Sequence, residues 1–212
     1  TFPSFSRLQD DKHALRIAIE KSIFIIAFAI FPVASAIISY SPYLIEYFPK
    51  YQKWEPALFS VAFFSLGSVI SAISTPLTNF LNAIGKVKVT LYFMIFWTVL
   101  IWLTTIFFVS FMGYNGVAVA SFSVALTSTG VFFVAKRYVS FSVFSVIYKQ
   151  FIASFIMFGF SYITGMFINS LVTTLLFGFI SAGVYILVMY LLAKEELTKT
   201  VLFVVRSIKA KK

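Results

Sequence analysis

The chain has 212 residues, of which 60% are hydrophobic and only 11% are charged, and its formal net charge is +10. A soluble domain is typically about 45–50% apolar and about 25% charged, so this composition excludes one and indicates an integral membrane protein. The absence of cysteine excludes disulfides, and a single histidine, His13, leaves little provision for a metal site. In a membrane protein a basic excess faces anionic lipid headgroups, so we expect membrane lipid and no nucleic acid as a partner.

Residues 1–21 are polar and begin with Thr1 rather than Met. Their acidic residues exclude a signal peptide, and we expect this chain to be the continuation of a longer protein. The segment predicts a turn followed by an amphipathic helix at the membrane surface. Asp10 or Asp11 is the expected N-cap of that helix, which leads into the first span.

Six later segments are long and apolar enough to cross a bilayer, whose core of about 30 Å needs roughly 20 helical residues. The predicted spans are 22–45, 57–83, 89–111, 117–135, 150–168 and 171–193. Residues 194–212 predict a basic amphipathic tail at the membrane surface. We therefore expect an all-α membrane protein with a connector at 1–21, a six-span lobe at 22–193 and a cytoplasmic tail at 194–212.

Lysine and arginine are distributed very unevenly between the two ends of these spans. Fifteen of the 17 fall in the N-terminal segment, the second-to-third loop, the fourth-to-fifth loop and the tail, and only Lys50 and Lys53 lie on the other side. Because cytoplasmic loops carry the excess of basic residues, both termini are predicted to be cytoplasmic.

The second span has a stripe of small polar side chains on one helical face, interrupted by Pro76. The stripe consists of Ser68, Ser71, Thr75, Asn79 and Asn82, with Thr78 beside Asn79. Two interpretations stay open. The small residues could serve close helix packing alone, or the stripe could line a polar cavity that forms a substrate path.

Three lysines stand at the predicted cytoplasmic ends of spans, namely Lys86, Lys88 and Lys149. They could be topology anchors whose stems extend along the interface. Alternatively, they could attract an anionic headgroup at the cytoplasmic mouth of a substrate path.

Catalytic chemistry is not indicated. All seven aspartates and glutamates lie in loops or at span edges. Because an enzyme active inside a membrane needs placed acids, bases or metal ligands, we expect no enzyme, no catalytic residue, no metal and no cofactor.

Several stretches resemble, in order, the C-terminal half of polysaccharide or O-antigen (Wzx-type) flippases of the multidrug/oligosaccharidyl-lipid/polysaccharide exporter superfamily. They are FPSFSRLQDD, the proline-containing span FIIAFAIFPVASAII, the interfacial LIEYFPKYQKWEPALFSV, PLTNFLNAIGKVKV and the hairpin MGYNGVAVASFSVAL. The chain departs from the family at Phe48-Pro49, where the family often has Phe-Gly.

The resemblance implies that this chain is the second six-helix lobe of a two-lobe exporter in a prokaryotic cytoplasmic membrane. The implied activity is the flipping of polyprenyl-pyrophosphate-linked oligosaccharide between leaflets by alternating access. The implied partners are the missing N-terminal six-span lobe, the lipid-linked oligosaccharide and polysaccharide assembly machinery. No lysine or arginine lies in the middle of a span here, so contact with the pyrophosphate would come from the missing lobe or from the mouth lysines.

Two other functions compete with this one. The first is a multidrug or small-solute exporter of the same superfamily, although no buried carboxylate suited to a cation exporter is evident in the spans. The second is a self-contained six-span subunit that binds a solute or scaffolds an assembly.

Overall fold

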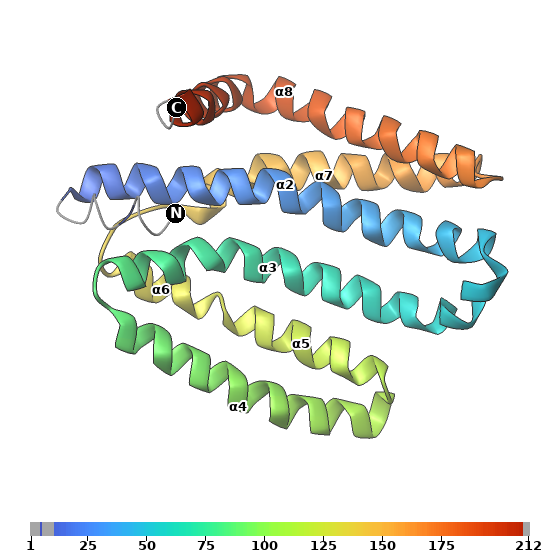
Figure 1. Cartoon of the computed structure of the whole chain (residues 1–212), viewed down its shortest axis with the longest axis horizontal. Helices are drawn as coiled ribbons and strands as arrows, with labels where there is room; N and C mark the ends of the chain where they lie inside the picture. Colours follow the sequence, from blue (N-terminus) through green and yellow to red (C-terminus); the bar gives the residue numbers. More distant parts are fainter. Residues whose placement is uncertain (1–4, 6–10, 210–212) are drawn as a thin grey trace.

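The computed structural model describes Phe5 and residues 11–209, and it describes the side chains of these residues except those of Pro49 and 199–209. All regular structure in the described part is helical (Figure 1). The elements are α2 (Lys12–Tyr47), the 3-10 helix η1 (Pro49–Ala57), α3 (Leu58–Ala83), α4 (Val87–Met112), α5 (Asn115–Thr127), α6 (Gly130–Lys136), α7 (Val143–Gly165) and α8 (Leu171–Lys209).

In the described part of the chain, six stretches of helix are long and apolar enough to cross a membrane, which confirms the predicted number and the all-α membrane class. The expected surface helix before the first span is not a separate element, because α2 runs unbroken from Lys12. Asp11 caps this helix: its Oδ1 accepts the backbone N–H groups of His13 at 2.9 Å and Ala14 at 3.0 Å.

The fourth stretch consists of two helices, because the chain turns at Ser128 and Thr129 between α5 and α6. Each hydroxyl donates to a carbonyl three residues back, Ser128 to Ala125 and Thr129 to Leu126, both at 2.7 Å. Such local side-chain bonds compete with the regular helical pattern and stabilise the turn.

Glycines allow two of the tight reversals between antiparallel helices. Gly85 precedes α4 with φ +77°, and Gly113 follows α4 with φ +57°. Glycine adopts these left-handed conformations at little steric cost, so each hairpin closes within a few residues. In α8 the backbone departs from helical geometry at Ala193 (φ −136°), where the expected basic tail adjoins the last span.

The helices pack side by side in the order α4, α5, α3, α2, α7 and α8, which differs from their order in the chain (Figure 1). Consequently α2 and α3 occupy the centre, while α4 and α8 form the edges. The α3–α4 turn, the α6–α7 connection, the start of α2 and the last part of α8 lie at one end of the bundle. Every described lysine and arginine except Lys50 and Lys53 belongs to that end, which we call the basic end.

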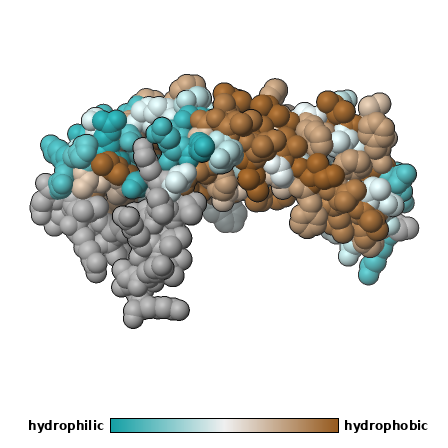
Figure 2. All heavy atoms as spheres, turned by 90° about the horizontal axis from the view of Figure 1, so that it is seen from above, coloured by the Kyte–Doolittle hydropathy of each residue, from teal (hydrophilic) through white to brown (hydrophobic). Residues whose placement is uncertain are grey.

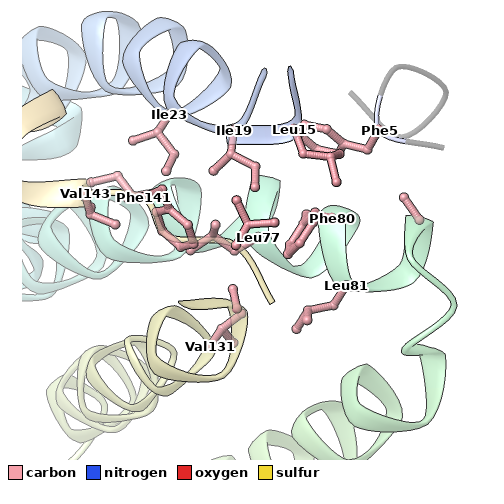
Figure 3. Packing of buried hydrophobic residues seen from close by; sticks show 14 of the residues in the cluster. Phe5, Leu15, Ile19, Ile23, Leu77, Phe80, Leu81, Val131, Phe141 and Val143 are labelled. Atoms are coloured by element: carbon pink, nitrogen blue, oxygen red, sulfur yellow. The ribbon is translucent and has the colours of Figure 1, made fainter. Parts of the chain in front are cut away.

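The main core, shown in Figure 3, includes the first turns of α2, the last turns of α3 and residues of α6, which lie toward the basic end. There Ile19 of α2 packs with Leu77 and Phe80 of α3, and Val131 of α6 and Phe141 before α7 belong to the same cluster. Thr90 is the only buried residue of α4, whose large apolar side chains are mostly exposed. Figure 2 shows the visible face as hydrophobic across its middle and hydrophilic toward its ends, which is the pattern of a protein surrounded by lipid.

Candidate functional site

The predicted polar stripe lies on the more exposed side of α3, and its last two residues, Asn79 and Asn82, are half-buried. Ser68, Ser71 and Thr75 are exposed, although they sit in the middle of a membrane-crossing helix. The opposite side carries Ile73 and Leu77, which are buried. The 3.6-residue period thus separates an apolar packing face of α3 from a polar face open to the surroundings.

Part of this polar face opens into a cleft of about 350 Å³ between α3, α4 and α5. We call it the hydroxyl cleft, because six of its ten lining residues carry a hydroxyl group. They are Ser71, Ser74, Thr75 and Thr78 of α3, Ser121 of α5, and Ser128 at the α5–α6 turn; the others are Trp97, Ile101, Val124 and Ala125.

Most hydroxyl protons in this cleft are used within their own helices. Thr75 Oγ1 donates to the Ser71 carbonyl at 2.9 Å, and Thr78 Oγ1 donates to the Thr75 carbonyl at 2.8 Å. The hydroxyl oxygens still offer lone pairs. The Trp97 Nε1–H is buried without an acceptor among the described residues. The cleft therefore offers several hydroxyl acceptors, which suits water or a hydroxyl-rich ligand, and its described lining holds no acid or base.

The other predicted stripe residues do not line the hydroxyl cleft. Ser68 is exposed on the same helix, while Asn79 and Asn82 are half-buried and closer to the basic end. Asn79 is already engaged in a polar contact. The Oδ1 atom of Asn82 is buried and accepts no hydrogen bond from the described part of the chain.

Ser35 of α2 faces a different space. Ser35 lines a second cleft of about 530 Å³ between α2, α3, α5 and α7, whose other walls are almost entirely apolar and include Phe31, Phe122 and Phe151. Ser154 of α7 also lines it and donates to the Phe31 carbonyl at 3.1 Å. Hydroxyls of the first and second spans thus lie in separate clefts within this chain.

The three predicted mouth lysines share the basic end but have different environments. The Lys86 Nζ lies 5.3 Å from the centre of the Tyr138 ring, and Lys88 is exposed in the first turn of α4. The Lys149 Nζ forms an ion pair with Glu196 of α8 at 2.6 Å. Since a paired ammonium is partly neutralised, Lys86 and Lys88 are better placed than Lys149 to attract an outside anion.

Some residues of these clefts escape sequence reasoning. Ser74, Trp97, Ser121 and Ser128 join the hydroxyl cleft, although they come from three helices and a turn. Ser74 and Thr78 follow Ser71 at three and seven residues, so the helical period could have placed these two hydroxyls on the same face of α3 as Ser71. Nothing in the sequence indicates which side of α4 or α5 meets that face.

The fold, the apolar middle and the basic end define a helical membrane protein that crosses the bilayer repeatedly. A family model described as "Polysaccharide biosynthesis protein" matches residues 1–59. This match supports a membrane protein of a polysaccharide biosynthesis or export family. No curated protein and no solved structure matched the chain.

Proposed function

We propose that this chain is one six-helix lobe of an exporter that flips a polyprenyl-pyrophosphate-linked oligosaccharide across the cytoplasmic membrane. Two observations support the proposal. The family match indicates polysaccharide biosynthesis, and the number of membrane-crossing helices fits one lobe of a two-lobe exporter. The basic end would face the cytoplasm, so both termini would be cytoplasmic.

The observation that best supports a transport path is the exposed polar side of α3. Hydroxyls in the middle of a spanning helix are poorly matched to lipid, so a water-filled path or another helical unit should cover Ser68, Ser71 and Thr75. A second lobe opposite this face would enclose a path lined by hydroxyl groups, which can exchange hydrogen bonds with sugars and water. Rocking of two lobes would then open this path to one side at a time.

An export assay in cells that make the polysaccharide tests this role. Replacing Ser71 and Thr75 together by leucine keeps the helix apolar but removes two hydrogen-bonding groups from the path. With each hydrogen bond worth about 1 kcal/mol, we expect export to slow by roughly tenfold to thirtyfold at unchanged protein level. The matched control is Thr98→Leu with Ser110→Leu, two exposed α4 hydroxyls outside the hydroxyl cleft.

The amides of the stripe provide a second test. Asn79→Leu with Asn82→Leu should also lower export if the path continues toward the basic end. Wild-type export by both the serine–threonine pair and the asparagine pair would exclude this face as the path. The face would then pack against a helix from outside this chain. A crosslink from a residue on this face of α3 to that helix would reveal such packing.

A further inference from the structure

A second, chemically different cleft lies at the basic end, where the first turns of α2 meet the connection that follows α6. Its volume is about 340 Å³, and five of its eight lining residues are basic. They are Lys12, His13 and Arg16 of α2 and Lys136 and Arg137 at the end of α6; Tyr138, Val139 and Ser140 complete the wall. We call this the basic cleft.

The positive charge of the basic cleft is only partly compensated. Arg16 Nε donates to Glu20 Oε1 at 3.1 Å, which neutralises one of its cations. Within the described side chains, no carboxylate lies at ion-pair distance from Lys12, Lys136 or Arg137. The carboxylate of Asp11 caps α2 through Oδ1 and does not line the basic cleft.

The rim of the basic cleft adds a further cation. Lys86, from the turn before α4, lies 5.3 Å from the ring centre of Tyr138, a residue of the cleft wall. This contact brings a third chain segment, distant in sequence from the other two, to the same place. An anion bound among these cations would be attracted by groups from three segments at once.

A neighbouring cleft at the basic end does not have this excess of basic over acidic side chains. That cleft has a similar volume of about 340 Å³ and is lined by Lys21 and Lys149 but also by Glu20 and Glu196. Two carboxylates stand among its lysines: Glu196 pairs directly with Lys149, and Glu20 is the acceptor of Arg16. Among the described residues, none with a carboxylate lines the basic cleft.

We propose that the basic cleft binds the phosphate group of an anionic lipid headgroup. Guanidinium and ammonium groups are the side chains that bind phosphate most strongly, and the hydroxyls of Tyr138 and Ser140 can donate further hydrogen bonds. Basic pockets at the ends of membrane helices are suited to such headgroups, which lie at this level of the bilayer. The inference does not depend on the transport proposal, because the basic cleft shares no lining residue with the hydroxyl cleft.

The experiment measures binding of a fluorescent phosphatidylglycerol to the purified chain in micelles of a neutral detergent. Each basic group near an anionic headgroup contributes a factor of about five, so Lys136→Gln with Arg137→Gln should weaken binding between about 5-fold and 30-fold. The control is Lys50→Gln with Lys53→Gln, which removes the same charge at the other end and should leave binding unchanged. All four side chains are exposed, so the variants should melt at the wild-type temperature.

Competition identifies the source of the phosphate. Inorganic pyrophosphate should displace the lipid only at concentrations far above that of the lipid, because it lacks the acyl chains that hold a headgroup at the interface. Displacement by pyrophosphate at concentrations equal to the lipid would overturn the assignment to a headgroup in favour of a soluble phosphate compound. Unchanged binding by the Lys136–Arg137 variant, or an equal loss in the Lys50–Lys53 control, would overturn the site itself.

Discussion

The Oγ atoms of Ser74 and Ser128 lie 2.9 Å apart, and this hydrogen bond joins α3 to the turn between α5 and α6. Both side chains are buried, with 3% and 6% of their surface exposed. The contact therefore holds the α3 side of the hydroxyl cleft against the turn between α5 and α6. It connects the stability of the lobe with the shape of its hydroxyl cleft.

Replacing both serines by alanine should reveal a modest coupling between the two sites. Each hydroxyl also lies within reach of a carbonyl of its own segment, Ser74 of Ile70 at 3.0 Å and Ser128 of Ala125 at 2.7 Å. Each has one proton, so when Ser128 donates to Ala125, Ser74 donates to the Ser128 oxygen. Interhelical hydrogen bonds in membrane proteins average about 0.6 kcal/mol, so we expect a coupling of about that size in a double-mutant cycle of unfolding free energies. Ser68→Ala, at an exposed position, is the control and should leave the unfolding free energy unchanged.

Gly116 is required by packing between α4 and α5. A Cβ atom at this position would lie 2.4 Å from the carbonyl carbon and oxygen of Phe108 and 2.6 Å from the Val109 nitrogen. Because these are backbone atoms and cannot rotate away, Gly116→Ala should destabilise the protein by about 2 kcal/mol or more. Thermal unfolding in detergent measures this loss.

Gly183 supplies the matched control for Gly116. It also lies within a helix, but a Cβ atom there would meet nothing within 4 Å. Alanine has the higher helix propensity, so Gly183→Ala should be neutral or slightly stabilising. Equal melting temperatures for the two variants would contradict the close approach of α5 to α4.

The contrast between these glycines shows where sequence reasoning reaches its limit. The spans follow from hydropathy and length, and the polar side of α3 follows from the helical period, because both are properties of single helices. The Ser74–Ser128 contact and the space at each glycine depend on which helices become neighbours. The basic cleft joins residues 12–16 to residues 136–140, and no local pattern indicates that pairing.

Cysteine labelling tests the proposed orientation directly, because the chain contains no cysteine of its own. Lys53→Cys lies in η1, at the end with only two lysines, whereas Lys88→Cys lies at the basic end; both positions are exposed. If basic loops face the cytoplasm, a membrane-impermeant maleimide added to intact cells should label position 53 and leave position 88 unlabelled until the cells are opened. The reverse pattern would place the termini outside.

Lys149 pairs with Glu196, so its role can be structural, in holding α8, rather than the attraction of a substrate. The lysine side chain is 18% exposed and the glutamate 48%, so water screens the pair, and we expect Lys149→Gln to cost no more than about 1 kcal/mol of unfolding free energy. The pair joins α7 to the segment of α8 that follows the break at Ala193. Loss of the pair should therefore expose that segment of α8 to limited proteolysis.

A charge swap separates the two roles of Lys149. In the double variant Lys149→Glu with Glu196→Lys, the pair can form again with its partners exchanged, so protease resistance should recover relative to Lys149→Glu alone. If the pair is structural, polysaccharide export should recover together with protease resistance. If export stays low while protease resistance recovers, a positive charge is needed at position 149 itself, which would assign this lysine to the headgroup of the substrate.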